Sequence, residues 1–371
     1  MKKVIKKKEI KFLEKYLNNP SPTGFESKGQ EIWMEYIRPY VDDFIVDDYG
    51  SVAGIVHGTG GKDGYRVVIE GHADEIGFFV NYITADGFIY LTRNGGSDHQ
   101  IAPSKRVVIH GRNGDVTGVF GWPAIHTRYG GKEEQKPTMK NIFLDVGAKD
   151  KAEVHKMGIY VGAPITYPDK FMVMNKKYFV GRALDNRAGG FMIAQVARLL
   201  KENEIKLPYD LYVVNSVQEE IGLRGAQMMA QTIKPNAAIV TDVTHDTNTP
   251  MINKVVEGDI NLGDGGVIAR GTAVQNELYD LIIKQADYRL IDYGLRATSR
   301  STGTDTDAFA YNTPGGCPSA LISLPLRYMH TTVEMCAKKD MESVIQLIYY
   351  TLQEIERGHD FRYIKGYKRS L

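Results

Sequence analysis

Residues 65–75 read Tyr65-Arg66-Val67-Val68-Ile69-Glu70-Gly71-His72-Ala73-Asp74-Glu75. The β-branched run that ends at Gly71 is typical of a buried strand. His72 and Asp74 follow at once, and residues two apart in an extended segment lie on one face. Asp74 can therefore hold the imidazole of His72, as metal-bound histidines usually require. Because ligands of open α/β sheets bind beyond the carboxyl ends of the strands, this stretch predicts a sheet strand and one edge of a binding site.

The same arrangement recurs at four other places. Apolar strand patterns lead into Asp185, into Glu219-Glu220, into Asp242 and into His330. Each of these residues alone has a simpler explanation, such as a helix cap, a solvated loop charge or a packed histidine. Together they predict one shared metal site. Two histidines and several carboxylates without cysteine suit Zn²⁺, Co²⁺ or Mn²⁺, and such a site is catalytic in type when it leaves room for a water.

The adjacent pair Glu219-Glu220 requires a local break in its strand. Neighbours in a regular strand point to opposite faces. Both carboxylates can serve one site only where the pleat has ended, and the nearby Gly222 and Gly225 favour such a break.

The order of the elements predicts an α/β fold. Helical periodicity, as between Phe191 and Leu200, alternates with apolar strands at 211–217, 237–240 and 320–324. We expect a mixed, largely parallel sheet flanked by helices. From 76 to 169, short β-type runs alternate with turn signals and predict a small inserted β-barrel-like domain. We therefore divide the chain into a discontinuous catalytic domain, residues 1–75 and 170–371, and an inserted domain, residues 76–169.

The composition excludes several classes of protein. The 371 residues carry 46 Lys and Arg against 45 Asp and Glu, a formal net charge of +1, which argues against a strongly basic nucleic-acid binder. Two cysteines without close spacing require neither a disulfide framework nor a thiolate metal site. No apolar run approaches the roughly 18 residues of a membrane span, and charges interrupt the segment where a signal peptide is apolar. We expect a cytoplasmic protein that binds neither nucleic acid nor membrane.

With these residues assembled, the chain resembles the tetrahedral (TET-type) glutamyl, aspartyl and deblocking aminopeptidases, a family of dinuclear metallo-aminopeptidases. The matching strings follow the expected order over nearly the whole chain. They are Ser21-Pro22-Thr23-Gly24-Phe25-Glu26, Gly71-His72-Ala73-Asp74-Glu75-Ile76-Gly77, Arg182-Ala183-Leu184-Asp185-Asn186-Arg187, Glu219-Glu220-Ile221-Gly222-Leu223-Arg224-Gly225-Ala226, Thr241-Asp242 and Arg327-Tyr328-Met329-His330.

The resemblance implies an enzyme that removes N-terminal residues from peptide substrates. It implies two divalent metal ions per subunit, zinc in the first place, with cobalt or manganese as alternatives. His72 and Asp242 would bind one ion, Glu220 and His330 would bind the other, and Asp185 would bridge both.

The resemblance also implies how the site works and how the chain assembles. Glu219 would be the general base, and Asp74 would support His72. A cis peptide bond would follow the bridging residue, at Asp185-Asn186. The inserted β domain would serve oligomerisation and substrate access, in a hollow tetrahedral dodecamer of identical chains with inward-facing sites.

The chain departs from the family pattern at two places. His330-Thr331-Thr332 stands where the family often has His-Ser-Pro, and residues 301–308 follow the family's Gly-Thr-Asp pattern loosely. Neither departure changes a proposed ligand, and both concern the substrate side of the site.

Three other functions use the same residues. A related dinuclear hydrolase, such as an amino-acid deacylase or a carboxypeptidase, would share the metal site. A glucan hydrolase would use Glu219 and Glu220, although paired glycosidase carboxyls lie about 5–9.5 Å apart and usually come from separate segments. A non-enzymatic metal or peptide-binding module would hold the metals without turnover.

Overall fold

The main sheet of the protein is a mixed sheet with a parallel centre. The computed structural model describes residues 3–60, 64–128 and 135–367. The eight strands have the order β1-β2-β12-β3-β13-β16-β14-β15. β12, β3, β13 and β16 are parallel neighbours, and antiparallel pairing occurs toward both edges. Their bounds are Asp43–Val46 (β1), Val52–Val56 (β2), Arg66–His72 (β3), Asp210–Ser216 (β12), Ala237–His245 (β13), Gly266–Gly271 (β14), Tyr293–Thr298 (β15) and Ser319–Leu326 (β16).

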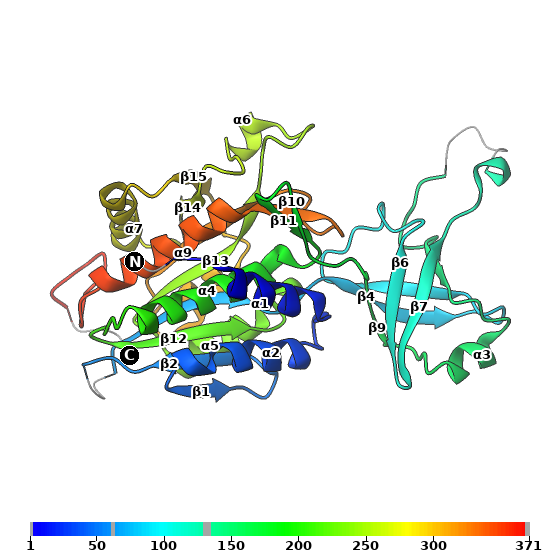
Figure 1. The fold of residues 1–371 in the computed structure, drawn as a ribbon, viewed down its shortest axis with the longest axis horizontal. Coiled ribbons are helices and arrows are strands. Elements are labelled where there is room, and N and C mark those ends of the chain that lie inside the picture. The colour runs from blue at the N-terminus through cyan, green and yellow to red at the C-terminus, as the bar shows by residue number, and fades with distance from the viewer. Residues whose placement is uncertain (1–2, 61–63, 129–134, 368–371) are drawn as a thin grey trace.

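Helices cover both faces of this sheet (Figure 1). α4 and α9 pack on one face with α1 and α2 beside α4, whereas α5 and α8 pack together on the other face, and α7 contacts β14 and α9. The predicted α/β fold is confirmed. The helices are α1 (Lys7–Asn18), α2 (Ser27–Ile37), α4 (Leu184–Glu202), α5 (Arg224–Ile233), α6 (Lys254–Glu257), α7 (Asn276–Arg289), α8 (Asp305–Asn312) and α9 (Lys338–Glu354), with short 3-10 turns at η1 (Arg38–Tyr40) and η3 (Glu219–Ile221).

α4 is the helix that brings a predicted ligand to the sheet. It is buried from Leu184 to Leu200, which explains the apolar residues on every side of it. A Cβ on Gly71 would lie 2.7 Å from the carbonyl carbon of Gly189, so the glycines allow α4 to approach β3 closely. The start of α4, with Asp185, therefore lies beside His72 at the end of β3.

β13 is longer than the sequence suggests. The apolar run 237–240 predicts a strand that ends before Asp242, but the strand continues to His245. The reason is its partner: residues Ala238 to His245 pair in parallel with β16 over its whole length. Asp242 therefore lies inside a strand and is held by the ladder.

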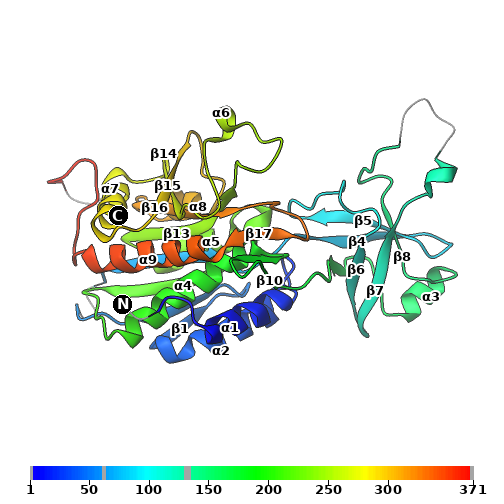
Figure 2. The same cartoon turned by 45° about the horizontal axis from the view of Figure 1, so that its top comes forward.

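The second part of the molecule is a closed β-barrel with its own core (Figure 2). Its strand order is β4-β5-β8-β7-β6-β9. The barrel lies within residues 76–169, where the sequence predicts it, while the division into two domains and their separate roles stay predictions. Its elements are β4 (Gly77–Ile83), β5 (Ile89–Asn94), β6 (Arg106–Gly111), β7 (Gly114–Gly121), β8 (Phe143–Asp145), β9 (Pro164–Thr166), the helix α3 (Lys151–Lys156) and the turn η2 (Ile125–Thr127).

A small three-stranded sheet connects the segment that follows the barrel with the segment that follows β16 of the main sheet. It contains β10 (Met172–Met174), β11 (Tyr178–Gly181) and β17 (Glu334–Ala337). Gly181 pairs with Glu334, so the segment that leads into Asp185 at the start of α4 runs beside the segment that follows His330.

Membrane insertion of a helix finds no support in the described residues. None of the helices in 3–60, 64–128 and 135–367 has both the length and the apolar character that a bilayer span requires.

Candidate metal centre

The predicted site residues converge at the carboxyl ends of the parallel strands. His72 closes β3 and Asp74 follows it, while Asp242 lies near the end of β13. Glu219 and Glu220 lie in η3 after β12, His330 follows β16, and Asp185 lies in the first turn of α4. The complete set is His72, Asp74, Asp185, Glu219, Glu220, Asp242 and His330, and all but His330 and the two glutamates are almost fully buried.

Asp185 lies between the two histidines. Its Oδ1 is 3.3 Å from His72 Nε2, and its Oδ2 is 3.1 Å from His330 Nε2. Glu220 Oε1 is 3.4 Å from His330 Nε2, and Asp242 Oδ1 is 4.0 Å from His72 Nε2. The Asp185-Asn186 peptide bond is cis, as the resemblance implies.

The Glu219-Glu220 pair lies in the 3-10 turn η3, where the strand pleat has ended. Gln218 before it has φ 57° and Gly222 after it has φ 117°, so the backbone turns through the left-handed region on both sides. Glu219 Oε2 lies 3.7 Å from His72 Nε2, on the side of His72 and Asp242. The turn thus directs both neighbouring carboxylates into one site.

Asp74 connects His72 to this turn. Its Oδ1 lies 3.3 Å from His72 Nδ1, at ion-pair distance rather than in a well-directed hydrogen bond. The same carboxylate accepts the backbone N–H groups of Glu219 (3.0 Å) and Glu220 (3.2 Å). Burial raises the pKa of Asp74, but His72, the Thr23 hydroxyl and the N–H of Glu219 outweigh it and hold the pKa below its ordinary value.

Two residues that the sequence did not single out hold the backbone and carboxylates of the site. Glu334 on β17 accepts the N–H of Asp185 on one oxygen (3.1 Å) and the N–H of His330 on the other (2.9 Å). Thr23 donates its hydroxyl to Asp74 at 2.8 Å. Thr23 lies in a string that matches the family, but neither residue has a signal of its own in the sequence.

The site contains more buried acidic groups than its own cations can keep ionised. Burial and the neighbouring acids Asp242, Asp305 and Glu220 raise the pKa of Glu219 to about 10, although His72 lowers it. Burial also raises the pKa of Asp242. Among the described residues, the ion pairs of Asp185, Glu219, Glu220 and Asp242 are with the two histidines alone.

These donors fit metal ions. Three donor atoms from His72, Asp185 and Glu220 lie within 4.8 Å of one another, and so do three from His72, Glu219 and Asp242. Imidazole nitrogen and carboxylate oxygen are ligands of Zn²⁺ and similar ions, and cations would neutralise the buried acids. The cluster can therefore hold metal ions.

The candidate metal site opens into a cavity of about 540 Å³. Residues 301–304 and Asp307 line it together with Arg296 and Met329. The 301–308 segment therefore lines the cavity beside the candidate ligands, and its role on the substrate side stays a prediction.

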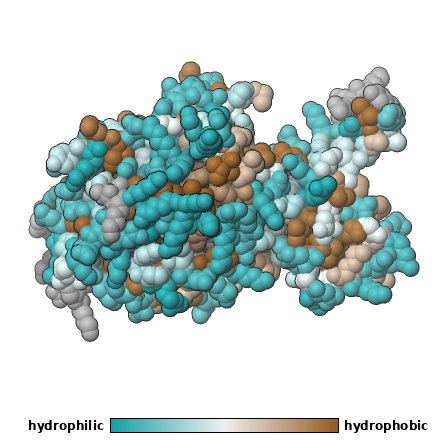
Figure 3. Space-filling model, viewed as in Figure 1, coloured by the Kyte–Doolittle hydropathy of each residue, from teal (hydrophilic) through white to brown (hydrophobic). Residues whose placement is uncertain are grey.

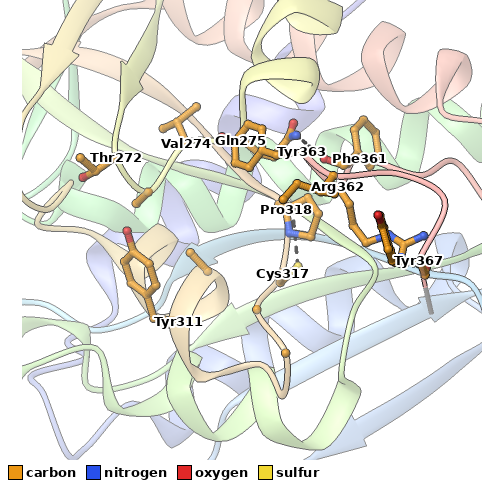
Figure 4. Close-up of a pocket in the computed structure, with 15 residues that line it drawn as sticks. Thr272, Val274, Gln275, Tyr311, Cys317, Pro318, Phe361, Arg362, Tyr363 and Tyr367 are labelled. Atoms are coloured by element: carbon orange, nitrogen blue, oxygen red, sulfur yellow. Dashed lines mark hydrogen bonds between the residues drawn. The ribbon is translucent and has the colours of Figure 1, made fainter. Parts of the chain in front are cut away.

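A larger cavity, of about 710 Å³, lies at the other end of β16 and has a different character (Figure 4). Aromatic side chains such as Tyr311, Tyr363 and Tyr367 line it beside Cys317. None of the described lining residues is an acid or a histidine, so this cavity offers no second metal cluster.

Comparisons with known proteins agree with the geometry. The family model for M42 glutamyl aminopeptidase matches residues 50–347. The putative aminopeptidase FrvX of Escherichia coli K12 is 32% identical over 343 residues, which cover 91% of this chain and 93% of FrvX.

Solved structures share both fold and sequence with the chain. The TET aminopeptidase of a marine sediment archaeon, Thaumarchaeota archaeon SCGC AB-539-E09, superimposes with a TM-score of 0.88 at 29% identity, over 94% of this chain and 97% of its own. PhTET1-12s, a dodecamer, gives a TM-score of 0.81 at 25% identity over 93% and 99%. The prediction of a metal-dependent aminopeptidase is confirmed, and so is the resemblance to the TET-type aminopeptidases. The match to more than half of the sequence shows that the chain belongs to the M42 glutamyl aminopeptidase family.

Proposed function

We propose that the chain removes N-terminal residues from peptides with two divalent metal ions, zinc in the first place and cobalt or manganese as alternatives. The observation that carries this proposal is the position of Asp185. Its two oxygens face different histidines, at 3.3 Å and 3.1 Å, which is the arrangement expected of a carboxylate shared by two ions. His72 and Asp242 would hold one ion, and Glu220 and His330 the other.

Different residues of the site have different roles in the proposed reaction. Divalent ions bound here would polarise the scissile carbonyl and lower the pKa of water toward neutrality. Glu219 is not assigned to either ion, and it takes the proton of the attacking water and passes it to the leaving nitrogen. Asp74 keeps His72 and the Glu219 backbone in place through the contacts described above.

The assembly and the role of the barrel extend this proposal. PhTET1-12s, which shares the fold and 25% of the sequence, is a dodecamer. We propose that this chain also forms a dodecamer, hollow and tetrahedral, in which the barrel contributes to assembly and substrate access. The predicted cytoplasmic location rests on the sequence alone and stays a prediction.

A panel of matched substrates tests the activity. One peptide is offered with a free N-terminus, with an acetylated N-terminus and with a blocked C-terminus, and an acylated amino acid and a glucan are added. An aminopeptidase cleaves the first and third and ignores the second. Cleavage that needs the acyl group or a free C-terminus would support a deacylase or a carboxypeptidase, and glucan cleavage with chelator present would support a glycosidase.

A further inference from the structure

The inserted barrel reaches the metal centre through one turn. This turn, Asn94-Gly95-Gly96, begins at the last residue of β5. A Cβ on Gly96 would lie 2.5 Å from His330 Nδ1 and 2.7 Å from His330 Cε1. A Cβ on Gly95 would lie 3.0 Å from Glu220 Cβ and 3.3 Å from Glu220 Oε2. The barrel thus packs on both residues that would bind the second ion.

A glycine is required at position 96 because there is no room for a side chain, and not because of its backbone conformation. Gly95 has φ +70°, a conformation that disfavours other residues in any surroundings. Gly96 is not among the positive-φ glycines, so its φ angle does not disfavour an alanine. Its Cβ would nevertheless overlap the His330 ring, since real Cβ contacts do not come closer than 3.0 Å.

The turn is anchored firmly. The amide of Asn94 donates to the Thr23 carbonyl at 2.9 Å, and Ser97 donates to the Gly77 carbonyl at 2.5 Å. Thr23 in turn holds Asp74, and Asn94 and Thr23 are both buried. The turn therefore cannot move away from His330 without breaking buried hydrogen bonds, each of which is costly to leave unmade.

A second contact holds the loop after His330. The barrel residue Lys105 donates its Nζ to Thr332 Oγ1 at 3.2 Å. Glu334 also holds the backbone of His330, whose N–H donates to Glu334 Oε1 at 2.9 Å. Glu334 thus holds the backbone and the turn packs on the imidazole ring of His330, with Nε2 directed to Asp185 and Glu220.

We propose that Gly96, anchored by Asn94, is a positioning residue for His330, and that the inserted barrel forms one wall of the second metal half-site. The missing side chain at position 96 leaves the room that His330 needs to keep Nε2 beside the two carboxylates. The proposal rests on the two-metal function proposed above.

Metal titration of the full-length Gly96→Ala variant tests the proposal. The metal-free protein is titrated with Co²⁺ in a calorimeter, beside wild type and Gly294→Ala. Gly294 is the matched control because its Cβ would meet one atom, Val267 Cγ2, at an ordinary 3.4 Å. We expect one Co²⁺ to bind Gly96→Ala as in wild type and the second to bind about 10- to 100-fold more weakly, the usual effect of disturbing the support of a ligand.

Activity supplies an independent readout. Peptide cleavage by Gly96→Ala should be low at limiting Co²⁺ and should recover as Co²⁺ is raised, because the residues that carry the reaction are intact. Two Co²⁺ sites of wild-type affinity in Gly96→Ala, or equal weakening in Gly294→Ala, would overturn the proposal.

A double variant separates the contact with His330 from general damage. In His330→Ala the ring is gone, so adding Gly96→Ala should change neither thermal stability nor the remaining Co²⁺ affinity. If Gly96→Ala destabilises His330→Ala as much as it destabilises wild type, the Cβ acts elsewhere and the proposal fails. A wild type that binds one ion would contradict the two-metal function, and the double variant would still decide the coupling between position 96 and His330.

Discussion

Glu219 and Glu220 are identical side chains whose positions differ by one step in a 3-10 turn. Glu220 stands 3.4 Å from His330 Nε2, and Glu219 stands 3.7 Å from His72 Nε2. We assign Glu220 to a metal and Glu219 to proton transfer, and the two roles respond differently to an amide. Glu219→Gln keeps the shape of the side chain but cannot take a proton.

For Glu219→Gln we therefore expect an unchanged metal content and a kcat lowered by about 10²- to 10⁴-fold, the usual contribution of a general base. Glu220→Gln, the neighbouring control, should instead lose metal. The measurements are metal analysis and steady-state kinetics on the same samples. A Glu219→Gln enzyme with full turnover would exclude the base assignment.

We predict that Arg296, which lines the cavity, selects among substrates. Arg296 is one of the lining residues, its guanidinium donates to Thr244 Oγ1, and within the described residues no carboxylate forms an ion pair with it. Thr244 follows Asp242 by two positions on β13, so the charge stands next to the metal cluster. An acidic side chain at the substrate N-terminus would meet this free cation.

Arg296→Met should lower kcat/KM for substrates with N-terminal Glu or Asp by about 10- to 100-fold, the value of a charge-assisted hydrogen bond. Cleavage of N-terminal Leu should change little. Arg300→Met, a change outside the cavity lining, is the control. An equal loss on acidic and apolar substrates would contradict a selective role.

The sequence predicts the residues that offer donor atoms but not the residues that hold them. Apolar strand patterns end just before the predicted ligands His72, Asp185, Asp242 and His330. This position can be read from the amino-acid sequence alone. Glu334 and Gly96 act through backbone hydrogen bonds and close approach between distant segments. Neither effect leaves a spacing or a periodicity in the sequence.

At the scale of elements, the segment 21–26 before α2 couples protonation to the site. Glu26 accepts the N–H groups of Gly24 (2.7 Å) and Gln218 (3.3 Å) on the same oxygen, so its other oxygen is free to carry a proton. Burial first, and then the charge of Asp74, raises the pKa of Glu26 to about 7 from 4.5. The folded chain therefore holds this proton more tightly than the unfolded chain.

A raised carboxyl pKa makes the folded state lose stability as the pH rises between the unfolded and folded values. Relative to Glu26→Gln, the metal-free wild type should lose up to about 3 kcal/mol of unfolding free energy between about pH 4.5 and 7, and nothing further above this window. Gln retains the accepting oxygen and does not titrate. Denaturant unfolding at pH 5, 6 and 8 measures the difference, and a constant difference would contradict the coupling.

The sequence predicts helices and strands best where a single hydrophobic periodicity, helical or strand-like, dominates the segment. α4 and the central strands follow from apolar patterning, and the barrel follows from short strands and turns. The end of β13 could not be predicted from apolar patterning, because its last residues are held by pairing with β16 rather than by their own hydrophobicity. The small sheet of β10, β11 and β17, which sets Asp185 beside His330, joins short segments far apart in sequence.

At the scale of the whole molecule, exposed apolar residues point to assembly. Val255 on α6 is 95% exposed and Met172 on β10 is 53% exposed. In Figure 3 hydrophobic surface gathers on the barrel and toward its junction with the α/β part. Surfaces of this kind are typical of protein interfaces.

We expect a particle of twelve chains, each of 41.5 kDa, as the proposed tetrahedral assembly requires. Native mass spectrometry and light scattering of the full-length chain, with and without chelator, measure this mass. A mass of one or two chains at micromolar concentration would contradict the assembly but leave the active site proposal untouched.

The most direct measurement of the central claim is metal content together with peptide cleavage on one preparation, before and after chelation. We predict two divalent ions per chain, cleavage of free N-terminal residues, loss of both on chelation, and recovery with Zn²⁺ or Co²⁺, whereas Asp185→Ala should bind neither ion tightly and stay inactive. A chain stripped of divalent ions that still trims peptides at the original rate would contradict the account.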